Sequence, residues 1–227
     1  MRNFVQYLNI ALLLFLLPVS LRADTSTVVA IQDGYVQSAN ATYATARDAT
    51  TGTSIADHIR VGQIPFEGTY YDFRAYLAFP IEDIAGTYTA AVLSIKGLQD
   101  ASTQDFDVHM VAAQYGPTLY ADDFASFTGH TASTAYTLTD LAETWNSESI
   151  VAWNSITLNA AGLSLLNAAQ GDTLWIALIS ANDAAKTAPT DSEYVRFYNS
   201  STADSEPYLT LTSSNAIQHK RHIIWSF

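Results

Sequence analysis

Acidic side chains occur in close pairs along the chain, and paired carboxylates are the groups that cleave glycosides or hold Ca²⁺. Four such pairs stand out: Asp105/Asp107, Asp122/Asp123, Asp191/Glu193 and Asp204/Glu206. A glycosidase needs two carboxylates on opposite sides of one bond, whereas residues two apart on a strand share a face of the sheet. The pairs therefore predict solvated surface carboxylates and not a catalytic centre.

Other catalytic signatures are missing from the sequence. It contains no cysteine, and it lacks the GxSxG, P-loop, HExxH and GxGxxG motifs. The histidines are scattered, and each is interpreted as a surface or hydrogen-bonded side chain: His58, His109, His130, His219 and His222. The sequence thus predicts a protein that is not an enzyme.

A structural Ca²⁺ is a further prediction, because this cation needs only clustered oxygen ligands from loops. The chain has no EF-hand spacing, so its ligands cannot be assigned from a motif. The acidic loop at residues 182–193 is the first candidate, with Asn182, Asp183 and Asp191 as the predicted metal ligands.

Aromatic residues point to a different chemistry. The chain has 13 Tyr and 4 Trp, and proteins commonly bind sugars on an aromatic platform flanked by a few polar groups. Tyr70 and Tyr71 precede a strand, and Arg74 and Tyr76 lie on the face of that strand opposite its apolar residues. For these tyrosines, sugar binding and core packing weigh about equally. Trp145 and Trp153 are interpreted as packing residues.

Alternating apolar residues predict an all-β protein. The expected strands are separated by Thr, Ser, Asp, Asn and Gly, and they cover residues 27–31, 34–39, 58–64, 73–81, 89–97, 105–113, 150–158, 173–180, 194–198 and 207–212. Many short strands favour an antiparallel jelly-roll β-sandwich. One or two short helices are expected, at residues 159–169 and 120–126, and long loops at residues 40–57 and 180–192.

The first 23 residues read as a signal peptide, because the basic residue Arg2 precedes an apolar run too short to span a bilayer. Cleavage is expected after Ala23, and an uncleaved anchor is the alternative. Residues 24–213 are expected to form one domain and residues 214–227 a basic and apolar tail. A secreted chain of this size without cysteine is typical of bacteria.

The net charge of the chain limits the classes of molecule that we expect it to bind. The whole chain carries −12, and because residues 1–23 hold two arginines and no acid, the remainder carries −14. Such a charge disfavours nucleic acid and anionic membranes, which bind through Lys and Arg. Neither partner is therefore expected, and no membrane is expected after signal cleavage. The oligomeric state stays open.

Several short motifs in combination resemble the DNRLRE-type domains, which are grouped with family 96 carbohydrate-binding modules. The similar stretches are the DGYV sequence at 33–36, RVG at 60–62, RAYLAF at 74–79, AVL at 91–93, WNSE at 145–148, WN at 153–154 and PYLTLT at 207–212. The resemblance covers roughly residues 27–213. It implies an extracellular jelly roll that binds polysaccharide.

Two departures from that pattern are a longer spacing between the tryptophans and Pro80 in place of an acidic residue. Alginate binding is associated with the family, but a domain at −14 repels a polyanion unless basic residues form a local face or Ca²⁺ bridges the two. Arg60, Arg74, Lys96 and Arg196 are the candidates for such a face.

Three functions follow from these observations. The first is a secreted, non-catalytic carbohydrate-binding module, whose predicted sugar-binding residues are Tyr70, Tyr71, Arg74, Tyr76, Arg60 and Lys96. The second is a structural or adhesive surface protein that does not bind sugar. The third and least favoured is a polysaccharide lyase or hydrolase, because the Gln-x-His strand of the jelly-roll lyases has no counterpart here.

Overall fold

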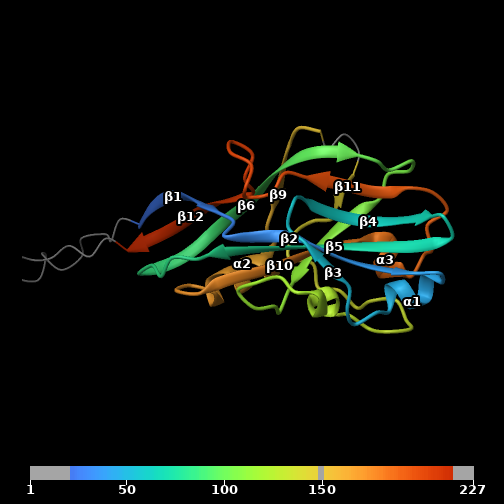
Figure 1. Cartoon of the computed structure of the whole chain (residues 1–227). Helices are drawn as coiled ribbons and strands as arrows, with labels where there is room; N and C mark the ends of the chain where they lie inside the picture. Colours follow the sequence, from blue (N-terminus) through green and yellow to red (C-terminus); the bar gives the residue numbers. More distant parts are fainter. Residues whose placement is uncertain (1–20, 148–150, 217–227) are drawn as a thin grey trace, which may run out of the picture.

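The computed structural model describes residues 21–147 and 151–216, and Figure 1 shows its arrangement. All paired strands within these residues are antiparallel, which confirms the predicted all-β architecture. The strands are β1 (Leu21–Val29), β2 (Gln32–Asn40), β3 (Thr53–Ile55), β4 (Ile59–Phe66), β5 (Thr69–Pro80), β6 (Gly86–Asp100), β7 (Asp107–Ala112), β8 (Trp145–Asn146), β9 (Trp153–Thr157), β10 (Thr173–Ser180), β11 (Glu193–Phe197) and β12 (Tyr208–Ala216).

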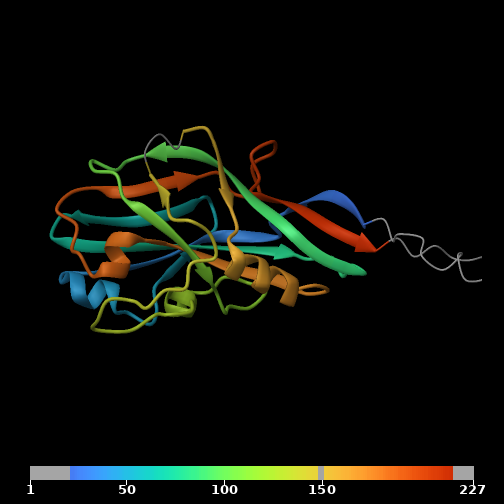
Figure 2. The same cartoon turned by 180° about the vertical axis from the view of Figure 1, so that it is seen from behind.

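These strands form one curled sheet in the order β1-β12-β6-β11-β4-β5-β10-β7-β8. Strand β9 pairs with β6, β2 pairs with β5, and β3 pairs with β2. The long strand β6 joins the two halves of the curl, because its first part pairs with β12 and β9 while its end pairs with β11. Seen from behind, β6 crosses the molecule obliquely between these partners (Figure 2).

Short helices cover part of the sheet. They are α1 (Tyr43–Arg47), the 3₁₀ helix η1 (Ala121–Ala125), α2 (Ala160–Ala168) and α3 (Ala181–Ala185). Helix α2 confirms the prediction for residues 159–169, and its N-cap Asn159 accepts hydrogen bonds from the backbone of Ala161 and Gly162. Helix η1 confirms the helical turn. The two predicted long loops are wrong in part, since one contains α1 and β3 and the other contains α3.

Two apolar clusters lie on the two faces of the sheet. The main core contains Ala75, Leu77 and Phe79 of β5 together with residues of β4, β6, β10, β11 and β12. A second cluster contains Tyr76 and Ala78 of the same strand, packed with residues of η1, α3 and the segment after β7. Strand β5 is therefore buried on both faces, and for Tyr76 the structure decides in favour of core packing.

The two ends of the described chain lie side by side, because Leu21 of β1 pairs with Ala216 of β12. Both strands extend three residues beyond the predicted domain of residues 24–213. The predicted signal peptide covers residues 1–20 and the start of β1, so most of it lies outside the described residues, as do residues 217–227 of the predicted tail. None of the helices in the described ranges is long and apolar enough to cross a bilayer.

Candidate functional site

Arg74 and Tyr76 are not surface residues, and their prediction as sugar-binding side chains is corrected. Both side chains are completely buried on the face of β5 that the helices cover. The Arg74 guanidinium forms a two-point ion pair with Asp183, with Nε 2.8 Å from Oδ2 and Nη2 3.1 Å from Oδ1. It also donates to the carbonyls of Phe124 and Arg47. The Tyr76 hydroxyl donates to the same carbonyl of Phe124 at 3.0 Å.

The network around Arg74 is densely charged. Asp72 Oδ2 lies 3.2 Å from Arg74 Nη2, and Arg47 lies over the ring of Tyr136 at 3.7 Å. Burial alone would lower the pKa of the Arg74 guanidinium, but Asp183 and Asp72 outweigh burial and hold that pKa above its usual value. Burial and the adjacent Asp183 raise the pKa of the Asp72 carboxyl. This network fastens α1 and α3 to β5.

The predicted Ca²⁺ ligands do not form a common oxygen cage. Asp183 faces two guanidinium groups, whose positive charge opposes a cation at the same carboxylate. Asn182 donates to Glu193 at 2.7 Å, and the exposed Asp191 accepts from the backbone of Ser192. No group of three or more His, Cys, Asp or Glu suited to a metal occurs in the described part of the chain. Calcium binding stays a prediction without an assigned site.

Arg60 of β4 lies in an aromatic cage on the outer face of the sheet. Its guanidinium carbon is 4.6 Å from the ring centre of Phe73, 4.8 Å from Tyr194 and 5.2 Å from Tyr35. Phe73 and Tyr35 are buried and form the floor of the cage, while Tyr194 stands at its side. The sequence produces this arrangement because Arg60 and Tyr194 alternate with Ile59, Val61 and Val195, which enter the main core.

A pocket of ≈ 200 Å³ opens beside this cage. Its lining combines aromatic rings, one amide and the guanidinium, from Gln37, Arg60, Ile64, Phe66, Tyr71, Phe73 and Tyr194. Phe66 is 54% exposed, and the Tyr71 ring stacks on Phe73 with an interplanar angle of 12°. Two of the predicted sugar-binding residues, Arg60 and Tyr71, therefore meet in one pocket. Tyr70 lies next to it on β5 but contacts Tyr43.

His58 and the exposed carboxylate of Asp57 lie next to Tyr35 of the cage. Burial and the nearby Asp57 raise the pKa of Tyr35 to about 12, so this phenol stays protonated. Burial lowers the pKa of His58, which approaches Asp57 through Nδ1. No described carboxylate forms an ion pair with Arg60, whose buried Nε also lacks a hydrogen-bond partner.

Lys96 lies away from the pocket, next to an exposed tryptophan. Its ammonium is 5.9 Å from the ring of Trp153 and 5.4 Å from that of Tyr198, and it donates to Ser205 Oγ at 2.9 Å. Trp153 is 43% exposed and contacts Tyr208, so its prediction as a packing residue is wrong. Trp145 is packed as predicted, against Phe197 of the main core.

Several residues of the pocket were not predicted. Gln37, Ile64, Phe66, Phe73 and Tyr194 come from four strands, and no local motif links them. One signal was present in the sequence. Strand β11 alternates Tyr194 and Arg196 with the buried Val195 and Phe197, and an aromatic and basic outer face is an uncommon choice for a merely solvated surface.

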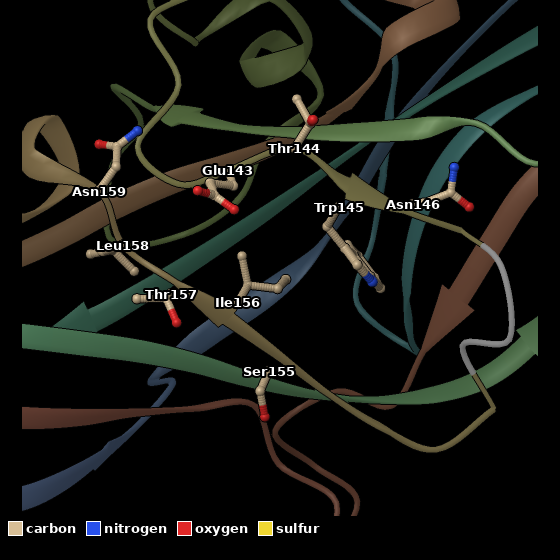
Figure 3. Close-up of a pocket in the computed structure, with 9 residues that line it drawn as sticks. All are labelled: Glu143, Thr144, Trp145, Asn146, Ser155, Ile156, Thr157, Leu158 and Asn159. Carbon is tan, nitrogen blue, oxygen red and sulfur yellow. The ribbon is translucent and has the colours of Figure 1, made fainter.

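A separate hollow lies where the curled sheet fails to close (Figure 3). It measures ≈ 430 Å³ and is lined by residues 143–146 and 155–159, from the two edge strands β8 and β9 and their flanks. Figure 3 shows Trp145 and Ile156 between the two ribbons. One antiparallel bridge, between Ala142 and Leu158, joins the edges at one end. Within the described residues, β8 pairs with β7 alone and β9 with β6 alone.

His58 and His109 agree with their prediction as surface or hydrogen-bonded side chains, whereas the buried Nε2 of His130 has no hydrogen-bond partner. His109 Nδ1 lies 2.9 Å from Asp140 Oδ1, at the edge of a cavity of ≈ 400 Å³. The Tyr136 side chain also lines this cavity, but its hydroxyl lies within the Arg74 network. His130 packs against Phe127 and Tyr136. His219 and His222 lie outside the described residues.

Comparison with known proteins adds no family to this picture. No family model matches the chain, and no curated protein matches it with significance. The resemblance to the DNRLRE-type domains therefore stays a prediction.

Proposed function

We propose that this protein is a non-catalytic module that binds an extracellular polysaccharide bearing carboxylate or sulfate groups, with its primary site at the Arg60 pocket. One observation carries the proposal: Arg60 is held among three aromatic rings at the edge of an open pocket and pairs with no described carboxylate. A guanidinium with free donors suits planar anions. The exposed ring of Phe66 and the half-buried ring of Tyr71 suit the apolar face of a sugar.

The shape of the site also supports this function. The pocket is open to the surface and is built on four strands of the sheet, an arrangement that suits a chain passing over a surface more than an enclosed small molecule. The curled antiparallel sheet is the architecture expected for the proposed jelly roll. The proposed secretion would place the module among extracellular polysaccharides.

Binding to paired polymers tests the proposal. Purified residues 21–227 are titrated with polygalacturonate and its fully methyl-esterified form, and with dextran sulfate and dextran, once with Ca²⁺ and once with EDTA. We expect binding to the charged member of at least one pair and loss of that binding in Arg60→Gln. Lys186→Gln is the matched control, because Lys186 is also a surface cation but pairs with Asp48 away from the pocket.

Each outcome separates the alternatives. Binding that Lys186→Gln weakens as much as Arg60→Gln would reflect net charge and would contradict the proposed site. Equal binding to both members of each pair would indicate a neutral-sugar site. Loss of binding in EDTA would add a functional Ca²⁺ site.

The open edges of β8 and β9 favour a second candidate, a structural or adhesive protein that self-associates by strand addition. The backbone N–H of Leu158 donates to the carbonyl of Ala91, and that of Gly97 donates to the carbonyl of Ala152. The even-numbered residues of β9 therefore direct their backbone hydrogen bonds toward β6. The backbone groups of Ser155 and Thr157 therefore face the hollow.

Strand addition is tested by sedimentation over a concentration series. We expect Ser155→Pro to abolish any concentration-dependent association while leaving the β6–β9 pairing intact, because proline removes an N–H on the free edge only. A wild-type chain that stays monomeric throughout the series would contradict this second function.

A further inference from the structure

The Arg60 cage is one end of a longer row of aromatic and basic side chains. Arg196 lies 5.4 Å from the ring of Tyr194, which Arg60 also contacts. Tyr198 directly follows the end of β11, where the alternation places it on the same side as Tyr194 and Arg196, and it contacts Lys96. Lys96 contacts Trp153, which contacts Tyr208. We call this row the aromatic track, defined by Arg60, Tyr194, Arg196, Tyr198, Lys96, Trp153 and Tyr208.

The track crosses four strands that pair in the order β4, β11, β6 and β9, of which β4 and β11 lie side by side in Figure 1. Three steps between neighbouring strands span about 14 Å across the sheet, and Tyr194 to Tyr198 covers about 13 Å in the perpendicular direction, along β11 and one residue beyond it. The pocket beside Tyr71 extends the row by one more strand, β5. This distance exceeds the reach of a single sugar and accommodates several consecutive sugar residues.

The cations of the track differ from the other basic side chains described. Arg47, Arg74 and Lys186 each pair with an aspartate. Arg60, Lys96 and Arg196 form no ion pair with a described carboxylate, and each lies against at least one aromatic ring. In a chain of net charge −12, three cations in one row that pair with no described carboxylate stay available to the anionic groups of a polysaccharide.

We propose that Trp153, Lys96 and Tyr208 form a distal subsite, so that the protein binds an internal stretch of one acidic polysaccharide chain along the whole aromatic track. This inference rests on the proposed function and adds to it a requirement for chain length. Occupancy of the Arg60 pocket brings the next sugars over Arg196 and Lys96, and Trp153 stacks on a sugar at the far end. Because both contacts belong to one ligand, the second is intramolecular and raises the affinity.

The test uses galacturonate oligomers of defined length, from the dimer to the octamer, and calorimetric titration of residues 21–227. For the wild type we expect the affinity to rise with length until the track is spanned. Trp153→Ala should leave the affinity for the dimer unchanged and lower that for the octamer roughly tenfold, which is what one aromatic contact contributes. Arg60→Gln should weaken binding at every length.

Two further variants serve as controls for Trp153→Ala. Tyr120→Ala removes another exposed aromatic residue that lies outside the track, and it should behave as the wild type. Trp153→Tyr should restore part of the length dependence, which a merely structural role of Trp153 would not predict.

The failures are distinguishable. If the wild type binds but Trp153→Ala keeps the same octamer-to-dimer ratio, the distal subsite is wrong and the Arg60 site stands. If Arg60→Gln changes nothing while Trp153→Ala weakens every length, the primary site lies at Trp153 and both assignments fall. If the wild type binds no oligomer and none of the charged polymers, the proposed function itself is wrong.

Discussion

Arg74 and Arg60 lie on neighbouring strands but in opposite chemical surroundings. Arg74 is completely buried, and two aspartates, two carbonyls and a phenol meet its guanidinium. Arg60 is partly exposed, its guanidinium lies among three aromatic rings, and its Nε has no partner. Both regions contain a guanidinium against aromatic rings, yet only the region of Arg60 adjoins the open pocket of the aromatic track.

The difference separates an arginine that supports the fold from one that can bind a ligand. Donors that are already satisfied by buried carboxylates gain nothing from an external anion, and removing one partner leaves the other charge buried. A cation held over aromatic rings keeps its position without a fixed anionic partner. It can therefore exchange water for a ligand group at little structural cost.

Substitution of Arg74 gives the largest expected effect. Arg74→Leu leaves Asp183 and Asp72 buried without their cation, and we expect a loss of about 3–5 kcal/mol in the free energy of unfolding. Arg60→Gln should change the same quantity by less than about 1 kcal/mol, because it removes no buried ion pair. Urea denaturation of both variants measures the contrast. Similar losses in the two variants would break the distinction drawn between the two regions.

We also expect the stability to depend on pH through Asp33, which lies outside both regions. Burial raises the pKa of Asp33 to about 6 although Ser200 donates two hydrogen bonds to it. The folded state therefore binds this proton more tightly than the unfolded state. The corresponding stability is fully present below pH 3.8 and is lost as the pH rises through 6, an effect of roughly 3 kcal/mol.

Unfolding of the wild type and Asp33→Asn between pH 3.5 and 7.5 measures this contribution. The difference between their unfolding free energies should shift in favour of Asp33→Asn as the pH rises. Taking the difference removes the opposite trend of residues such as Asp48, whose ion pair with Arg47 lowers its pKa despite partial burial. A constant difference across this range would show that folding does not shift the pKa of Asp33.

Alternation along the chain was sufficient to predict most strands and the antiparallel class, because burial of one face leaves a period-two pattern. The same pattern was insufficient to predict that Arg74 and Tyr76 are buried. Their side of β5 is covered by residues distant in sequence, among them Phe124, Tyr136 and Asp183. A polar or aromatic residue opposite a core face looks the same in sequence whether water or another segment covers it.

The candidate site was predictable in part for a related reason. Arg60 and Tyr71 were identified from the abundance of aromatic residues and the charge pattern, but their pocket also requires Phe66, Tyr194 and Gln37 from other strands. Gly62, between Arg60 and the end of β4, has a φ of 120° and lies against β11 so closely that a Cβ there would be 2.1 Å from Glu193 O. That contact brings Tyr194 to Arg60, and it depends on strand pairing that no local pattern specifies.

Ionic strength provides a finer test of the same contrast between the two arginines. Binding of polygalacturonate to the aromatic track should weaken as NaCl rises from 20 to 300 mM, because its cations are accessible to solvent. The network of Arg74 is buried, so the free energy of unfolding should respond far less to the same salt. Calorimetric titration and urea denaturation in matched buffers measure both quantities. Salt-independent binding would contradict the part assigned to Arg60, Lys96 and Arg196.

The smallest expected effect on stability is that of Phe66, the most exposed ring of the pocket. Phe66→Ala should change the free energy of unfolding by no more than about 0.5 kcal/mol, since surface substitutions without buried partners rarely do more. Its effect on polysaccharide affinity should be larger than its effect on stability, because an exposed ring at a pocket edge contributes area chiefly to the complex. Tyr120→Ala, with a similarly exposed ring elsewhere, should change neither quantity. If Phe66→Ala unfolds more easily yet binds polysaccharide normally, Phe66 contributes to stability and not to binding, and the site is restricted to Arg60 and Tyr71.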